Sequence, residues 1–247
     1  MMSREILMIT GEDREHFLQG LVTNDVMQLK DGLVYTAMLT PQGKYIADFF
    51  LVPHGEAILL DVDASLAAML SQRLTMYKLR SKVKIEPSGL HLHRGLGKRP
   101  EGAFSDPRHA ALGWRDYRDE PQAEDTTDWI SLRIVHGIPE TGAELTSDTF
   151  ILEMGFERLH GVDFKKGCYV GQEVTARMKH KTELRKGLAR VVADGPLREG
   201  AQITADGKAA GTVLSVAGNA ALAYLRFDRA EAGLEAEGQA LRFERLD

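Results

Sequence analysis

Short apolar runs separated by turn sequences fill residues 187–247, and this pattern restricts the fold of that segment more than any other feature of the chain. Side chains of a strand point alternately to its two faces, so an alternating run buries one face only. Turn-forming sequences (Asp194-Gly-Pro, Asp206-Gly, Gly218-Asn) lie between the runs. The runs are Leu188–Val192, Ala201–Thr204, Gly211–Val216, Ala220–Phe227 and Ala240–Glu244. This pattern predicts a small C-terminal β-barrel domain at 187–247.

Residues 1–186 combine strands and helices, and we expect them to form one larger domain. Turn sequences such as Thr40-Pro-Gln-Gly and Pro53-His-Gly separate its apolar stretches. The expected strands are Ile6–Ile9, Val34–Leu39, Tyr45–Val52 and Ala57–Val62, and the expected helices are Glu15–Gln19 and Ser65–Met76. The sequence therefore predicts an α+β fold, with an antiparallel meander crossed by a helix.

The segment from Tyr77 to Ile85 changes to a period of two. A strand here would place Lys78, Arg80, Lys82 and Lys84 on one face. Such a face is either the solvated outside of a sheet or the wall of an anion-binding site.

A further helix is predicted after Asp125-Thr-Thr-Asp128, which offers capping side chains. Trp129, Leu132, Ile134 and Val135 are its candidate buried residues. Trp129 either packs in the core or presents a flat surface on which an aromatic ring could stack.

The chain has one cysteine, Cys168, which excludes an internal disulfide and a four-cysteine metal site. We therefore expect a free thiol in a reducing compartment. The charged N-terminal stretch is unlike a signal peptide, and no apolar run approaches the ~20 residues of a membrane span. The sequence predicts a cytoplasmic protein with no membrane partner, and histidine spacing suggests no metal site. The net charge of −5 argues against nucleic acid as a partner.

The segment from Lys165 to Arg177 carries the strongest chemical signal. Glycines 167 and 171 bracket Cys168, and the apolar spacing after them predicts a helix that begins at the cysteine. A helix N-terminus and the lysines before it would favour the thiolate. Residues 165–186 hold seven Lys or Arg and two acids, which would attract an anion such as a folate, a phosphate ester or an RNA loop. The alternative is a small buried cysteine beside a solvated basic helix.

The sequence Lys166-Gly-Cys-Tyr-Val-Gly-Gln-Glu173 resembles the signature of the YgfZ family, whose members are relatives of the glycine-cleavage T-protein. Other segments are similar to that family in the same order. They are Phe17–Val26, Pro41–Asp48, Leu79–Val83, Trp129–Glu140 and Phe150–Met154.

The resemblance implies a T-protein-like folate-binding body with antiparallel sheets in two lobes at 1–186, the second lobe at roughly 36–110, followed by the barrel. It implies that tetrahydrofolate is the cofactor and that Cys168 is the working residue, as a nucleophile or as a transient cluster ligand. The implied role is support of iron–sulfur protein assembly or repair, with iron–sulfur proteins or cluster-assembly components as transient partners. The implied folate contacts are Asp48, Trp129, Arg133, Lys166, Tyr169, Gln172, Glu173 and Arg177.

Several of these residues also have simpler interpretations. Asp48 could be a solvated residue at a sheet edge, and Glu173 with Arg177 could form only a helix ion pair at i, i+4. The T-protein carries an acid in the segment where Val135 and His136 stand here, so aminomethyltransferase activity is not expected. Whether the chain is an enzyme stays open. Two further functions remain: a folate-dependent one-carbon transferase on an unknown substrate, and a non-catalytic scaffold for a cluster-carrying partner.

Overall fold

The computed structural model describes residues 3–181, 184–230 and 233–246. The chain forms two compact units, each described here by itself. The first comprises Met1–Thr127 with Leu159–Gln172, and the second comprises Asp128–Arg158 with Glu173–Asp247. The sequence-based boundary before residue 187 differs from this division, because 128–158 and 173–186 group with the C-terminal segment.

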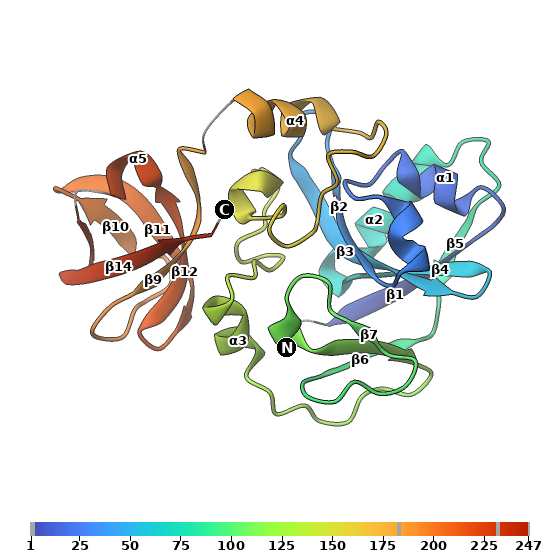
Figure 1. Cartoon of the computed structure of the whole chain (residues 1–247), viewed down its shortest axis with the longest axis horizontal. Helices are drawn as coiled ribbons and strands as arrows, with labels where there is room; N and C mark the ends of the chain where they lie inside the picture. The colour runs from blue at the N-terminus through green and yellow to red at the C-terminus, as the bar shows by residue number, and fades with distance from the viewer. Residues whose placement is uncertain (1–2, 182–183, 231–232, 247) are drawn as a thin grey trace. The chain divides into compact units, whose positions relative to one another are not determined.

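A five-stranded antiparallel sheet forms the centre of the first unit, with strand order β2-β3-β4-β1-β5 (Figure 1). Strand β2 was predicted with its observed bounds, and β1, β3 and β4 extend one or two residues beyond the predicted limits at one or both ends. The strands are β1 (Arg4–Thr10), β2 (Val34–Leu39), β3 (Tyr45–His54), β4 (Ala57–Asp63) and β5 (Lys84–Pro87).

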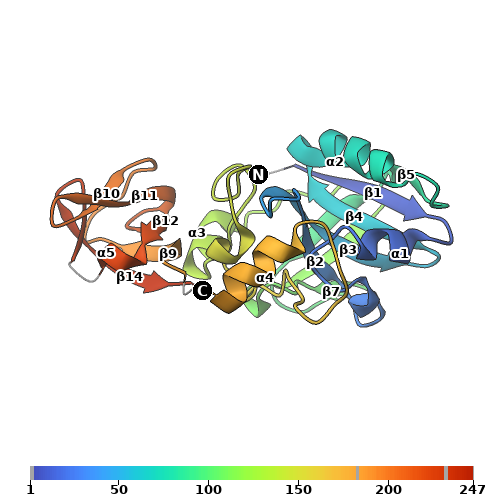
Figure 2. The same cartoon turned by 90° about the horizontal axis from the view of Figure 1, so that it is seen from above.

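Helix α2 (Ala64–Tyr77) covers one face of this sheet (Figure 2). Its buried Leu70 and Leu74 belong to the same apolar core as Leu60 and Val62 of β4. Asp63 caps the helix by accepting a hydrogen bond from the backbone N–H of Ser65 at 2.9 Å. Helix α1 (Arg14–Gln19) and the 3-10 helix η1 (Val26–Lys30) contribute further residues to this core.

A second, three-stranded sheet lies in the same unit, with order β6-β8-β7. Its strands are β6 (His91–Gly95), β7 (Phe104–Ser105) and β8 (Trp114–Arg118), and the 3-10 helix η2 (Ala110–Leu112) precedes β8. Residues of β4 alternate, so Leu60 and Val62 join the apolar core while Asp61 bonds to Arg115 and Tyr117 of β8. The large sheet is therefore buried on both faces, which explains why every residue of β2 is buried.

The strand predicted from Tyr77 to Ile85 is wrong over most of its length. Helix α2 continues to Tyr77, Lys78 caps it, and a turn follows before β5 begins at Lys84. The four cations therefore do not share one strand face. The alternation is real, but the backbone N–H of Lys78 bonds to Leu74 and that of Lys82 to the carboxylate of Asp13, which is far away in the sequence.

The second unit contains the predicted barrel, a closed six-stranded sheet of order β10-β11-β12-β9-β14-β13 (Figure 1). Its interior is filled by small and branched residues, including Ala189, Val191, Ile203, Val213 and Leu225. The five predicted strands are all present, and β13 was missed because it is short. The strands are β9 (Lys186–Val192), β10 (Gln202–Ala205), β11 (Lys208–Ala217), β12 (Ala220–Arg226), β13 (Leu234–Ala236) and β14 (Gln239–Arg245), and helix α5 (Phe227–Ala230) follows β12.

Three further elements complete the chain: α3 (Trp129–Val135), the 3-10 helix η3 (Ile151–Met154) and α4 (Gln172–Lys181). Asp128 caps α3 through the N–H of Ser131, as predicted. Ile134 is buried as expected, but Val135 is exposed and Arg133 is buried in its place. Over the residues described, no helix has both the length and the apolar character needed to cross a membrane.

Candidate functional site: an exposed thiol on an anchored loop

Cys168 lies on the loop 161–171 of the first unit, and its side chain is exposed. The expected helix start at the cysteine is wrong, because α4 begins four residues later at Gln172. Gly171 has φ +86°, a left-handed conformation that separates the cysteine from the helix. The thiol therefore does not lie in the first turn of a helix.

Lys166 anchors this loop from within. Its Nζ atom donates hydrogen bonds to three backbone carbonyl oxygens, at 2.8 Å to Gln19, 2.5 Å to Val22 and 3.0 Å to Asn24. Burial lowers the pKa of Lys166 to about 8, which the nearby carboxylates of Asp25 and Asp163 only partly oppose. Lys166 thus ties the cysteine loop to the segment from the end of α1 to the start of η1. All three of its N–H donors are bonded to carbonyl oxygens of the protein.

The same stretch between α1 and η1 holds the first half of the loop. The hydroxyl of Thr23 donates to the carbonyl of Gly161 at 2.7 Å, and the amide of Asn24 donates to that of His160 at 2.7 Å. The backbone N–H of Asp163 bonds to the carbonyl of Thr23 at 3.0 Å, and its carboxylate accepts the N–H of Lys165 at 2.6 Å. Both Thr23 and Asn24 are buried, so these bonds are shielded from water.

The second half of the loop packs against the turn between β2 and β3. The N–H of Val170 bonds to the carbonyl of Gly20 at 3.3 Å. A Cβ at Gly171 would lie 2.6 Å from the carbonyl oxygen of Thr40, so only glycine fits this approach. Tyr169 is buried, with the Lys166 ammonium 5.0 Å from its ring centre. The exposed thiol is thus carried by a loop that is bonded on both sides.

Asp48 lies in β3, where it is buried and not solvated at an edge. Its two carboxylate oxygens accept hydrogen bonds from the hydroxyls of Tyr35 at 3.0 Å and Tyr45 at 2.7 Å. Burial, and next the Asp48 carboxylate, raise the pKa of Tyr35 well above its ordinary value. Asp48 therefore belongs to a buried polar cluster formed by side chains of β2 and β3.

Next to this cluster lies a charged network that the sequence did not reveal. The fully buried Asp61 accepts bonds from Arg4 at 2.6 Å, Arg115 at 2.5 Å and Tyr117 at 2.8 Å. Burial alone would raise the pKa of Asp61, but the charges of Arg4 and Arg115 outweigh it and lower the pKa to about 2. The Arg115 guanidinium also lies 3.9 Å from the ring centre of Phe50.

Arg108 extends the network toward Asp48. Its guanidinium binds Asp106 at 2.8 Å and lies 5.4 Å from the ring centre of Tyr35, whose hydroxyl bonds to Asp48. The sequence signal for this network is an acid, Asp61, between the apolar Leu60 and Val62 of β4, and its bonded partners lie more than fifty residues away.

The remaining predicted residues belong to the second unit, except Gln172, whose amide reaches the carbonyl of Gly167 at 3.5 Å. Trp129 is half-buried, and Glu173 and Arg177 are exposed. Among the ion pairs of the described residues, the pair between Glu173 and Arg177 that was the alternative to a folate-binding role does not occur. Lys179 instead binds Glu157 at 2.6 Å.

Arg133 is buried inside the second unit. It binds Glu144 at 3.0 Å, Glu140 at 3.1 Å and the hydroxyl of Ser215 in β11 at 2.5 Å. These contacts join α3 to the barrel. Like Lys166, Arg133 has protein groups as its partners.

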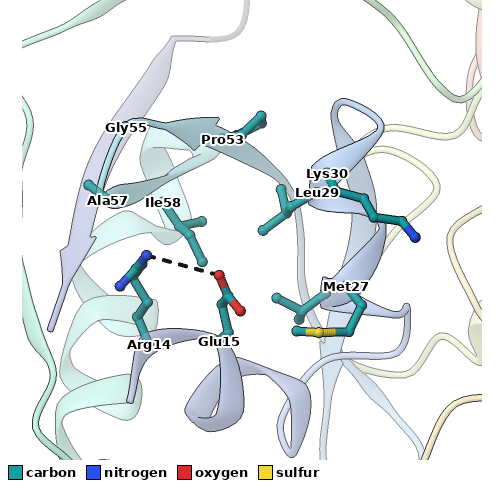
Figure 3. Close-up of a pocket in the computed structure, with 10 residues that line it drawn as sticks. Arg14, Glu15, Met27, Leu29, Lys30, Pro53, Gly55, Ala57 and Ile58 are labelled. Carbon is teal, nitrogen blue, oxygen red and sulfur yellow. Dashed lines mark ion pairs between the residues drawn. The ribbon is translucent and has the colours of Figure 1, made fainter. Parts of the chain in front are cut away.

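A hollow of 440 Å³ in the first unit lies between α1, η1 and the β3–β4 hairpin (Figure 3). Leu29 and Ile58 point into it, and Arg14 and Glu15 lie side by side with their charged atoms 4.0 Å apart. None of the residues predicted to bind folate lines it. No cluster of three or more His, Cys, Asp or Glu suited to a metal ion occurs within 3–181, 184–230 and 233–246.

The predicted folate contacts divide into two groups. Asp48, Arg133, Lys166 and Tyr169 are buried and bonded to or packed against protein groups, so they fit a supporting role better than direct contact with a ligand. Trp129, Gln172, Glu173 and Arg177 are at least partly exposed and have side chains suited to stacking on, or hydrogen bonding to, a pterin and a carboxylate tail.

Comparison with known proteins gives the chain its relatives. The family described as "CAF17, C-terminal beta-barrel domain" matches residues 185–247. The mitochondrial iron-sulfur cluster assembly factor IBA57 of Mus musculus is 34% identical, covering 90% of this chain and 75% of that protein. The protein of the same name from Homo sapiens is 33% identical with the same coverage. The homolog from Mycosarcoma maydis is 32% identical, but the match covers 74% of this chain and only 54% of that protein.

Among solved structures, the glycine cleavage system aminomethyltransferase T from Bartonella henselae has a TM-score of 0.79. The match covers 96% of this chain and 82% of that one at 16% identity, and it confirms the expected fold class. The expectation of a cytoplasmic protein is wrong on this evidence, because the relatives are named as mitochondrial proteins. They also carry the name IBA57 and not YgfZ, so the expected family is confirmed at a coarser level. With 34% identity over most of both chains, the protein belongs to the IBA57 family of iron-sulfur cluster assembly factors.

Proposed function

We propose that this protein supports the assembly or repair of iron–sulfur proteins and that Cys168 is its working residue. The observation that carries the proposal is the exposed thiol on a loop that is bonded on both sides of the cysteine, through Lys166 and Val170. A cysteine that only packs in the core would be buried, and a cysteine at an incidental surface position would not require a loop held by buried hydrogen bonds. The names of the relatives agree with this role.

An exposed thiol can serve this role in two ways. As a thiolate it could complete the coordination of a cluster iron that the partner protein holds incompletely, because one protein thiolate cannot bind a cluster alone. It could also act as a nucleophile on the client protein or on a folate-bound one-carbon unit. In both cases the anchored loop fixes the position of the sulfur atom, so a partner meets it without ordering the loop first.

We further propose that tetrahydrofolate binds to this protein, supported by the T-protein-like fold and by the side chains of Trp129, Glu173 and Arg177 in the second unit, which are at least partly exposed. In this proposal the tryptophan stacks on the pterin, and the arginine pairs with a carboxylate of the glutamyl tail. Folate when bound would supply one-carbon chemistry, while Lys166 and Arg133 keep the chain that carries these residues in place.

The test is rescue of iron–sulfur enzyme activity in cells that lack the protein. Cys168→Ser should keep the wild-type melting temperature, since the side chain is exposed, and should lose rescue. Lys165→Gln, an exposed neighbour, is the matched control and should rescue fully. If Cys168→Ser rescues as well as the wild type, the role of the thiol is disproved.

Titration with tetrahydrofolate separates the alternatives. Binding without turnover supports the assembly role with folate as a bound cofactor, and turnover with a one-carbon donor would identify a transferase. If saturating folate changes neither tryptophan fluorescence nor the melting temperature, the scaffold function remains and the folate proposal fails. A ligand at 100 times its dissociation constant should add about 2.7 kcal/mol of stability, which such a melt would detect.

A further inference from the structure

The turn after α2 presents an apolar residue to solvent in a strained backbone conformation. Leu79 has φ +41° and its side chain is 87% exposed. The left-handed region costs an L-residue roughly 1–2 kcal/mol, and exposure of a leucine gains nothing in an isolated chain. Packing within the described residues explains neither the left-handed backbone of Leu79 nor the exposure of its side chain.

The turn is nevertheless held in a defined shape. The N–H of Ser81 bonds to the carbonyl of Lys78 at 2.6 Å, and the Lys78 ammonium bonds to the carbonyl of Val83 at 3.0 Å. The carboxylate of Asp13 accepts the N–H of Lys82 at 2.7 Å. The strain at Leu79 is therefore imposed by bonds on both sides of it.

Leu79 is part of a larger surface, which we call the Leu79 surface and define by Met76, Tyr77, Lys78, Leu79, Arg80 and Ser81 with Asp13 and His16. Met76 is 68% exposed and Tyr77 is 36% exposed, so three apolar side chains at the end of α2 face solvent. All of these residues except Met76 line a shallow hollow of 720 Å³.

The charges of this surface are unequally paired. Lys82 binds Glu12, and Lys84 binds Glu86 at 2.8 Å. Lys78 has only a backbone carbonyl as its partner, and Arg80 has no hydrogen bond or ion pair among the residues described. The single carboxylate in the hollow, Asp13, is engaged by the backbone of Lys82. Two cations thus flank Leu79 without a carboxylate to bind.

We propose that the Leu79 surface docks a segment of a partner protein in which an apolar side chain is flanked by Asp or Glu. The apolar side chain packs against Leu79, Met76 and Tyr77, and the carboxylates pair with Arg80 and Lys78. The inference rests on the proposed function, because an assembly factor must contact its client, and it names the chemistry of that client's docking segment.

The experiment uses two acetylated peptides as probes, Asp-Glu-Leu-Leu-Glu-Asp and the charge-reversed Lys-Arg-Leu-Leu-Arg-Lys, titrated into the full-length isotope-labelled protein. NMR shifts should move at residues 76–82 with the acidic peptide and not with the basic one. Arg80→Glu and Leu79→Asp should each lower the affinity for the acidic peptide about tenfold or more. The control Lys98→Glu, an exposed cation elsewhere in the unit, should leave binding unchanged.

Leu79→Gly separates docking from folding. It removes the side chain and relieves the strain, so the melting temperature should rise while peptide binding falls. In cells, Leu79→Asp and Arg80→Glu should rescue iron–sulfur enzyme activity less well than the wild type. Equal shifts with both peptides, or full rescue by both variants, would overturn the docking surface, whereas failure of the wild type itself to rescue would overturn the proposed function.

Discussion

The Nζ atom of Lys166 lies 2.5 Å from the carbonyl oxygen of Val22, a residue 144 positions earlier in the chain. This bond, with those to Gln19 and Asn24, joins the cysteine loop to the segment that follows α1. Lys166 was expected to bind folate and to favour the thiolate. Its observed contacts make it the residue that positions Cys168.

Lys166 should titrate near pH 8, below the ordinary lysine pKa of 10.5, because burial disfavours its charged form. Between about pH 8 and the ordinary lysine value of 10.5 the folded chain has released a proton that the unfolded chain keeps. The free energy of unfolding should therefore gain a positive slope with pH in this window, and below pH 8 the penalty for burying the ammonium is fully present.

Stability measured by urea unfolding from pH 7 to pH 10.5 tests this expectation. In Lys166→Met this rise of the unfolding free energy with pH should be absent. The variant should also be less stable at pH 7, because three carbonyl oxygens lose their hydrogen-bond donor. Lys165→Met, at an exposed neighbour, should behave as the wild type. The same slope in Lys166→Met would assign the titration to another group.

Cys168 should react with a thiol reagent in the native state, because its side chain is exposed and its loop needs no opening. The stoichiometry should reach one thiol per chain without denaturant, and urea should not increase it. Labelling that requires denaturant would show that the thiol is covered in solution.

Much of the fold could be predicted from periodicity, because the signals involved are local. The bounds of β2 and the turn-separated strands of the barrel depend on alternation and on turn residues close in sequence. The cap of α3 by Asp128 is likewise a local signal.

The errors share a physical cause, which is control by contacts distant in sequence. Alternation from Tyr77 suggested a strand, but the bond from the Lys82 N–H to Asp13 fixes a turn there. The helix expected at Cys168 begins later because Gly171 packs against Thr40. The partners of Asp61 on other strands were invisible to any local pattern.

Asp61→Asn should destabilise the protein by about 3–5 kcal/mol, because it leaves the charges of Arg4 and Arg115 in a buried site without their carboxylate. Asp116→Asn removes a more exposed pair with Arg118 and should cost about 0–1 kcal/mol. Chemical denaturation at pH 7 gives both values. A cost for Asp61→Asn of no more than about 1 kcal/mol would show that the buried pairs of Asp61 do not stabilise the fold.

The same carboxylate predicts an acid limit. The pKa of Asp61 is about 2 in the folded chain and 3.8 as its ordinary value, so its contribution to stability is present above pH 4 and is lost as pH falls toward 2. The difference in unfolding free energy between the wild type and Asp61→Asn should shrink over this window. A difference independent of pH would mean that Asp61 does not titrate there.

Gly171→Ala should test whether the cysteine loop must stay packed on the β2–β3 turn. The new Cβ would lie 2.6 Å from the carbonyl oxygen of Thr40 and 3.0 Å from the Cβ of Leu39, and the backbone has φ +86°. Gly97→Ala is a matched control, because Gly97 has φ +80° with no atom within 4 Å of the added Cβ. The control should cost about 1–2 kcal/mol from backbone strain alone. Gly171→Ala should cost more, should displace the loop, and should lose rescue of iron–sulfur enzyme activity beyond what the control loses. Equal stability and equal rescue for the two variants would show that the position of the loop, and with it the position of the Cys168 sulfur, is not what the function requires.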